Sequence, residues 1–248
     1  MKFLEIHNLF KNFKGLMAIE DLSYQLDNGE IIGLVGPNGA GKTTLFNLIT
    51  GFLTPTGGDI FLKGNSIRGL SPYKIVKKGI SKTFQIPKPF YSLNCLENIV
   101  VSSLSNFEGT RQEKKRINEK AMSILCLVGL QEKWEMFPAA LTQGDLKILE
   151  VAKALATNPE LVLLDEPFAG LTLTEIDQII SIIQSLHQKN LSIIIIEHKL
   201  RELMKIVNRV IVLNFGVKIA DGSPKEVTNN EEVIKAYLGS GRSSFAAA

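Results

Sequence analysis

Cysteine, histidine and tryptophan are scarce in this chain of 248 residues, which contains two cysteines, three histidines and one tryptophan. Cys95 and Cys126 stand far apart, and neither belongs to a Cys-x-x-Cys pair. Two such thiols make a poor disulfide framework. We therefore expect a reducing, cytoplasmic compartment, in which both cysteines serve as small apolar side chains.

Long hydrophobic runs are also missing. No stretch approaches the ~18 consecutive apolar residues of a membrane-spanning helix. The strongest runs, at 161–164 and 193–196, have the length of strands. Residues 1–10 include Lys, Glu, His and Asn, which is unlike a secretory signal peptide. If the protein works at a membrane, we expect it to dock on a partner there.

A strong charge of one sign is absent as well. The net charge is +3, and no long basic run supports it, so the sequence gives no electrostatic argument for nucleic-acid binding. Hydrophobic residues make up 45% of the chain, enough for a substantial core. The length suits one large domain, or one domain with a subdomain.

A glycine-rich loop at 36–43 is the strongest signal that is present. It follows the apolar run 31–35 and precedes a predicted helix at 43–50, and it matches the phosphate-binding pattern G-x-x-x-x-G-K-[ST]. Glycines let the backbone amides approach phosphates, Lys42 supplies a point charge, and the hydroxyl of Thr43 suits Mg²⁺. We therefore expect ATP and Mg²⁺ at Gly36, Pro37, Asn38, Gly39, Ala40, Gly41, Lys42 and Thr43.

Acidic residues end the apolar run 161–164, and a histidine ends the run 193–196. In an open parallel sheet, ligands collect at the carboxyl ends of strands. We expect Asp165 to hold Mg²⁺ there and Glu166 to polarise a water molecule. His198 would then contact the γ-phosphate. The alternative is an ordinary strand end, with two solvated surface acids and a histidine satisfied by its neighbours.

The order of the predicted elements indicates an α/β fold. Residues 3–30 suggest two or three strands, and residues 90–140 carry apolar positions at helical spacing. Beyond them, helices (146–157, 174–189, 199–205) alternate with strands (161–164, 192–197, 209–214), which predicts a parallel sheet.

With these parts in order, the sequence resembles the nucleotide-binding subunits of ABC transporters over residues 3–239. GPNGAGKTT at 36–44 and LLDEP at 163–167 match the two Walker motifs of that family, and IIIIEH at 193–198 matches its switch-histidine motif. The glutamine of KTFQIPKPF resembles the Q-loop glutamine, and Phe13 falls where the family stacks an aromatic ring on adenine. The resemblance thus adds Phe13 and Thr44 to the nucleotide site, and implies catalytic roles for Glu166, His198 and Gln85 and metal binding by Thr43, Gln85 and Asp165.

The signature motif of the family is present in altered form. LTQGD at 141–145 stands where Leu-Ser-Gly-Gly-Gln is usual, so Gln143 and Asp145 are departures. Thr172 likewise replaces the usual Asp of the D-loop. By the resemblance, Thr142 and Gly144 contact the ATP bound to a second subunit. The second subunit is then a copy of this chain or a sister subunit.

The resemblance implies a P-loop NTPase of the ABC ATPase type. Its mostly parallel core sheet carries an N-terminal antiparallel β subdomain and an inserted α-helical subdomain. We expect one domain over 1–239, with the catalytic core at 1–85 and 141–239, the helical subdomain at 86–140, and a disordered tail at 240–248. It would hydrolyse ATP at the cytoplasmic face of the membrane, bound to permease subunits and acting indirectly with a solute-binding protein.

Within the family, the sequence is most similar to subunits for uptake of branched-chain, hydrophobic amino acids. The similar segments include GLMAIEDLSYQL, ITGFLTPTGGDI and EVIKAYLG. Urea-uptake and lipopolysaccharide-export ATPases share several of them. Two further classes stay open at this stage, a soluble ABC ATPase without a membrane partner and a P-loop kinase.

Overall fold

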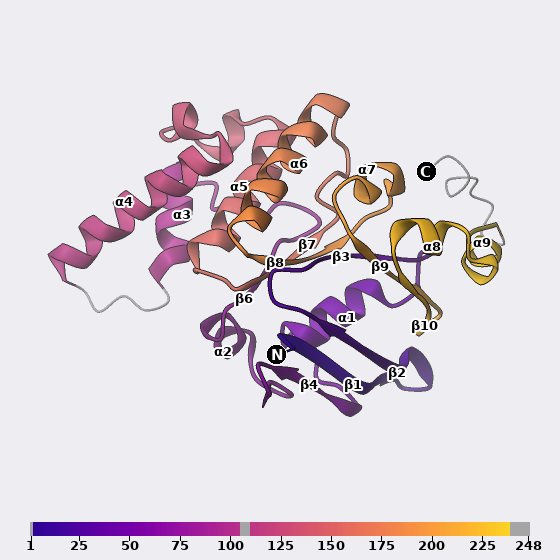
Figure 1. The fold of residues 1–248 in the computed structure, drawn as a ribbon. Coiled ribbons are helices and arrows are strands. Elements are labelled where there is room, and N and C mark those ends of the chain that lie inside the picture. The colour runs from indigo at the N-terminus through magenta and orange to yellow at the C-terminus, as the bar shows by residue number, and fades with distance from the viewer. Residues whose placement is uncertain (1, 105–109, 239–248) are drawn as a thin grey trace.

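The computed structural model describes residues 2–104 and 110–238, so the tail predicted at 240–248 lies outside the described residues. Two sheets and the helices around them form the body of the molecule (Figure 1). A six-stranded sheet lies at the centre, and a smaller four-stranded sheet lies below it with α1 between the two (Figure 1).

The central sheet has the strand order β10-β9-β3-β8-β7-β6, and all neighbours are parallel except β10 and β9. Every residue of β3, β7 and β8 is buried, which explains why these strands are nearly continuous apolar runs. The strands are β3 (Ile31–Val35), β6 (Ile80–Lys82), β7 (Leu161–Asp165), β8 (Ser192–Ile196), β9 (Arg209–Asn214) and β10 (Val217–Gly222).

Alternate residues of these strands face two separate hydrophobic cores. Ile193 and Ile195 of β8 belong to a core formed with the helices on one face of the sheet. Ile194 and Ile196 belong to a second core, shared with α1 and the antiparallel sheet. The first core is covered by α3 (Cys95–Ser103), α4 (Arg111–Val128), α5 (Gln143–Ala156), α6 (Leu173–Gln188) and α7 (Leu200–Met204).

The four-stranded sheet is antiparallel, with the order β2-β1-β4-β5. Its strands are β1 (Leu4–Phe13), β2 (Leu16–Leu26), β4 (Gly57–Leu62) and β5 (Asn65–Ser66). The helices α1 (Lys42–Ile49) and α2 (Pro72–Lys77) complete this part of the chain. The predicted fold class, a mostly parallel core sheet with an antiparallel β part and helices, is confirmed.

Within the described part of 86–140, the chain forms α3, α4 and two short 3₁₀ turns, Gln131–Lys133 and Pro138–Ala140. Of the apolar positions at helical spacing on α4, Ala121, Ile124, Leu125 and Val128 are buried, whereas Ile117 is only half-buried. In Figure 1 these helices stand to one side of the central sheet, beside α5. The division into a catalytic core and a helical subdomain stays a prediction.

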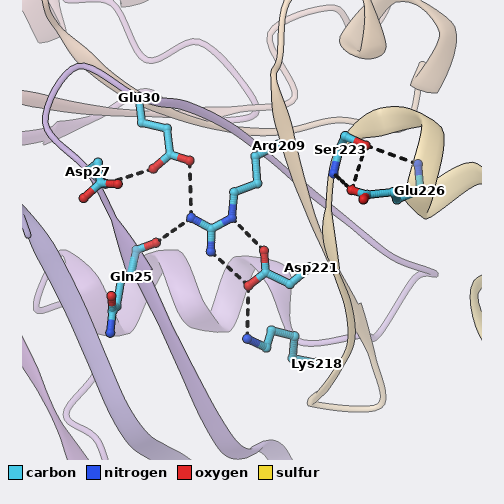
Figure 2. Close-up of polar contacts among 8 residues, drawn as sticks. All are labelled: Gln25, Asp27, Glu30, Arg209, Lys218, Asp221, Ser223 and Glu226. Carbon is cyan, nitrogen blue, oxygen red and sulfur yellow. Dashed lines mark hydrogen bonds and ion pairs between the residues drawn. The ribbon is translucent and has the colours of Figure 1, made fainter.

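An arginine joins the C-terminal hairpin of the central sheet to the antiparallel sheet (Figure 2). Arg209 donates from Nε and Nη2 to the two carboxylate oxygens of Asp221, at 2.6 and 2.9 Å. Its Nη1 donates to the carbonyl of Gln25 and to Glu30, at 3.0 and 3.2 Å. Such a forked pattern uses the planar guanidinium fully. It ties β9 and β10 to β2 and to the turn before β3.

Two helices follow this hairpin, α8 (Pro224–Thr228) and α9 (Glu231–Leu238). None of the helices described is long and apolar enough to cross a membrane. Most predicted boundaries differ from the structure by about one residue, and the largest error is at α5. This helix begins at Gln143, not at Leu146, because Thr142 caps it and brings the altered signature into its first turn.

Candidate functional site

The glycine-rich loop joins the end of β3 to the start of α1. Gly36 has a φ of +151°, and a Cβ there would lie 2.1 Å from the carbonyl oxygen of Leu213. The loop therefore packs directly on β9, which only a glycine permits. The ammonium of Lys42 lies over the loop and donates to the carbonyls of Gly36 and Pro37, at 2.7 and 2.9 Å. Burial lowers the pKa of Lys42, whereas Glu166 and Asp165 act against that shift.

A hollow of about 490 Å³ opens beside this loop. It brings together most of the residues expected to bind the nucleotide with all three expected to be catalytic. Its lining contains Phe13, Asn38, Gly39, Ala40, Gly41, Lys42, Thr43, Thr44, Gln85, Glu166 and His198.

Three side chains meet at the carboxylate of Glu166. The amide Nε2 of Gln85 donates to Glu166 Oε2 at 2.9 Å, and Nε2 of His198 lies 3.1 Å from Oε1. Glu166 has a φ of +49°, a left-handed backbone that costs an L-residue energy. Its amide donates to the carbonyl of Ile196 at 2.9 Å, which helps to hold that conformation. The site thus carries strain of the kind found at functional residues.

Asp165 is buried at the end of β7, and it does not line the hollow. Burial raises the pKa of its carboxyl, and the nearby charge of Lys82 opposes the rise. The described residues contain no cluster of three His, Cys, Asp or Glu that would hold a metal ion alone. Thr43, Asp165 and Gln85 offer oxygen donors, however, and such donors fit Mg²⁺ that arrives with phosphate oxygens.

Thr142 and Gly144 lie apart from this hollow, at the start of α5. The structure therefore does not bring the altered signature to the nucleotide loop of the same chain. Gly36 and Pro37 belong to the loop without lining the hollow.

The departure at Asp145 has a structural role. Thr142 Oγ1 accepts from the amide of Asp145, and the carboxylate of Asp145 accepts from the amide of Thr142, each at 3.1 Å. This reciprocal pair is a capping box. Lys133 donates to both carboxylate oxygens, at 2.7 and 2.6 Å. Burial alone would raise the pKa of Asp145, but the hydrogen bonds from Lys133 and Thr142 outweigh it and hold that pKa below its usual value.

The departure at Thr172 is also a helix cap. Thr172 and Glu175 form the capping box of α6, in which Glu175 accepts from the amide of Thr172 at 2.9 Å. The backbone of Gly144 lies near this carboxylate and, after Thr172, helps to lower the pKa of Glu175. A Cβ on Gly144 would lie 2.6 Å from the carboxylate of Glu175, so the two helix starts are in close contact. Nothing in the structure explains Gln143, which is exposed.

Several residues of the site were missed by the sequence analysis. Leu16, Met17 and Ala18 line the hollow beside Phe13, and Phe215 does so from the β9–β10 turn. Phe215 is 80% exposed and has a positive φ, +45°. The sequence offered one signal for this position, the glycine at 216 that follows the apolar strand predicted at 209–214.

Comparison with known proteins adds independent findings. The family model "ABC transporter" matches residues 19–169, and the model "Branched-chain amino acid ATP-binding cassette transporter" matches 217–242.

The high-affinity branched-chain amino acid transport ATP-binding protein LivG of Salmonella typhimurium is 37% identical, over 95% of this chain and 97% of its own length. BraF of Pseudomonas aeruginosa, which carries the same description, is 36% identical over the same shares. The structure of the ADP conformation of MJ1267, an ATP-binding cassette of an ABC transporter, matches with a TM-score of 0.88 and 29% identity, covering 96% of this chain and 99% of that one.

Proposed function

Because the chain belongs to the ABC transporter family, we propose that it hydrolyses ATP to energise uptake of branched-chain or other hydrophobic amino acids. The observation that carries ATP hydrolysis is the meeting of Gln85 and His198 at the Glu166 carboxylate, in the same hollow as Lys42. The solute class is supported by the similarity to LivG and BraF, which are branched-chain amino acid transport ATP-binding proteins, and by the family model at 217–242.

The glycine-rich loop binds the triphosphate. Its backbone amides and the N-terminus of α1 form an anion site, and the ammonium of Lys42 exchanges the carbonyls of Gly36 and Pro37 for phosphate oxygens. The base stacks on Phe13, which is 41% exposed and lines the same hollow. Burial of the lysine strengthens its attraction for phosphate because water screens the charge less.

Glu166 orients the attacking water and accepts its proton. His198 and Gln85 hold the two oxygens of this carboxylate in place, at 3.1 and 2.9 Å. His198 then donates a hydrogen bond to the γ-phosphate. Catalysis of phosphoryl transfer depends mainly on such positioning and on charge stabilisation.

Thr43, Asp165 and Gln85 would hold Mg²⁺ through hydroxyl, carboxylate and amide oxygens. When bound, the ion neutralises charge on the β- and γ-phosphates. The buried carboxylate of Asp165 is suited to this role, because a nearby cation offsets the cost of its burial.

A second subunit completes each nucleotide site. Thr142 and Gly144 lie outside the hollow of their own chain and present the start of α5 for a neighbouring ATP. The Thr142 hydroxyl accepts a capping bond and keeps its own hydrogen to donate to a phosphate. The partner is a copy of this chain or a sister subunit.

A groove of about 290 Å³ between α2, β6 and α5 supports a binding site for permease subunits. With the permease bound there, the chain is a peripheral subunit at the cytoplasmic face of the membrane. Exposed rings of Phe52 and Tyr73 line the groove. Lys82 lies 5.1 and 5.2 Å from the ring centres of Phe52 and Phe84. Apolar walls with a charged rim suit an amphipathic segment of a membrane partner.

Uptake by a reconstituted transporter tests the proposal. The chain, its sister subunit where one is required, the permease subunits and the solute-binding protein are placed in liposomes with ATP inside. We expect ATP-dependent accumulation of labelled leucine, isoleucine or valine, and none with Glu166→Gln. Glu166→Gln is isosteric and keeps a hydrogen-bonding group between Gln85 and His198, so it is a matched control.

Three outcomes would overturn the proposal at different levels. ATP hydrolysis without uptake of any hydrophobic amino acid, but with movement of urea or lipopolysaccharide, would refute the solute class. Hydrolysis by a chain that never co-purifies with membranes would place it among soluble ABC ATPases. Transfer of the γ-phosphate to a small molecule would instead indicate a kinase.

A further inference from the structure

Lys147 is a buried cation that touches the backbone of two residues of the site. It lies on α5 and is 4% exposed. Its Nζ donates to the carbonyl of Gln85 at 2.5 Å and to the carbonyl of Glu166 at 3.0 Å. Burial of a lysine costs free energy unless its donors are satisfied. These two hydrogen bonds therefore hold α5 at a fixed distance from the backbone of Gln85 and of Glu166.

The second carbonyl belongs to the strained residue of the site. Glu166 has a left-handed φ of +49°, and its amide donates to Ile196. Lys147 binds the other end of the same residue. A strained backbone persists only when its surroundings hold it on more than one side. The ammonium of Lys147 and the carbonyl of Ile196 supply those two restraints.

The same helix begins with the residues that face a second subunit. Thr142 caps α5, Gly144 lies in its first turn, and Lys147 follows just over one turn after Thr142. α5 is one continuous helix of 14 residues. Rigid secondary elements of this kind can carry coupling between two sites. Any displacement of Thr142 or Gly144 by a neighbouring nucleotide is therefore transmitted to the two carbonyls held by Lys147.

We infer that Lys147 is a positioning residue that couples the hydrolysis site of its own chain to the signature that contacts the second subunit's ATP. The inference rests on the proposed ATPase function. Lys147 does not touch the substrate: it fixes the backbone of Gln85 and Glu166, whose side chains meet at 2.9 Å. When the start of α5 contacts the second subunit's ATP, the side chains of Gln85 and Glu166 are aligned. When this contact is lost, the two side chains separate.

The test compares Lys147→Met, Lys147→Gln and Lys147→Arg with the matched control Lys120→Met in the full chain. Lys120 also donates to a carbonyl of α5, that of Ala156 at 2.9 Å, but at the far end of the helix. Steady-state ATP hydrolysis gives kcat, KM and the Hill coefficient. Thermal unfolding checks that each variant is folded.

We expect Lys147→Met to lower kcat by about ten- to a hundredfold, because a small misplacement of a reacting group has an effect of that size. KM for ATP stays near the wild-type value because the loop is untouched, and the Hill coefficient falls towards one. Lys147→Arg, which keeps two donors, recovers most of kcat, and Lys147→Gln lies between them. Lys120→Met keeps all three parameters.

A kcat and Hill coefficient in folded Lys147→Met equal to those of Lys120→Met would overturn the inference, as would a rise in KM that matches the fall in kcat. If Lys147→Met does not fold, Lys147→Gln and Lys147→Arg decide by the same criteria. An inactive wild-type chain would refute the proposed function. A fully active wild type with an equally active, equally cooperative Lys147→Gln would refute only this inference.

Discussion

The ion pair between Lys133 and Asp145 allows a quantitative test of why this chain departs from the usual signature. We propose a double-mutant cycle with Lys133→Met, Asp145→Asn and the double variant. Asparagine keeps the shape of the cap residue and removes its charge, and methionine keeps most of the aliphatic stem of lysine. The cycle isolates the energy of the pair, because effects that each side chain exerts elsewhere cancel.

The expected coupling energy follows from the exposure of the two side chains. The side chain of Asp145 is 11% exposed and that of Lys133 is 38% exposed. A fully exposed pair contributes about 0.2–1 kcal/mol, whereas removing one partner of a buried pair costs about 3–5 kcal/mol. The short contacts favour a strong pair, but solvent screens the half-open lysine, so we expect about 1–2 kcal/mol. For a chain of this size, that corresponds to a loss of about 2–8 °C in Tm.

The effect of pH follows from the depressed pKa of Asp145. Folding favours the ionised carboxylate of Asp145. The stability that this carboxylate adds to the folded protein is therefore fully present above the ordinary aspartate pKa of 3.8, and it is lost as the pH falls through the lower pKa of Asp145 in the folded protein. Urea unfolding at neutral pH should show the full difference between wild type and Asp145→Asn. The difference should shrink below a pH of about 3.8, wherever the protein still folds.

Two results would refute the reasoning. A coupling energy under about 0.5 kcal/mol at neutral pH would mean that the contact is no stronger than a surface pair. A difference between wild type and Asp145→Asn that grows as the pH falls would mean that the folded carboxyl has a raised pKa.

Three further predictions concern the nucleotide site. Lys42→Ala should weaken binding of a fluorescent ATP analogue, because the buried ammonium is the loop's side-chain cation, and unchanged affinity would refute its role. Glu166→Gln should bind ATP, lose hydrolysis by about a hundredfold or more, and accumulate as an ATP-bound dimer in size-exclusion chromatography; turnover at the wild-type rate would contradict the assignment. Gly36→Ala should lower Tm far more than Gly69→Ala, since a Cβ at 36 meets the carbonyl of Leu213 at 2.1 Å, whereas at 69, where φ is also positive, it meets nothing within 4 Å.

Much of the site could be predicted because parallel strands end at one edge of the sheet. The apolar runs before Asp165 and His198 identified β7 and β8, and the rule that ligands collect at carboxyl strand ends placed their following residues near the loop. Glu166 and His198 do line one hollow with Lys42. Asp165 follows the same rule in sequence, and it is buried at the end of β7 without lining the hollow, so its metal role stays a prediction.

Other features depend on contacts that local patterns do not carry. The pairing of Lys147 with Gln85 and Glu166 joins segments 62 and 19 residues apart, and a single lysine within a helix gives no local sign of either partner. The cap at Thr142 was detectable, because Thr-x-x-Asp before an apolar helix is a capping signal. It was overlooked because the same residues were interpreted only as a nucleotide contact, so the predicted start of α5 fell three residues late.

The order of strands in the central sheet has a consequence for synthesis on the ribosome. β3, which leads into the glycine-rich loop, has β8 and β9 as its two neighbours, and both are encoded far downstream, at residues 192–214. At ribosomal speeds of about 5–20 residues per second, the strand waits roughly 8–30 s with both edges unpaired. A nascent chain truncated before β8 would expose an apolar edge able to pair with other chains. Stalled or prematurely ended translation should therefore yield aggregation-prone fragments that cannot retain ATP.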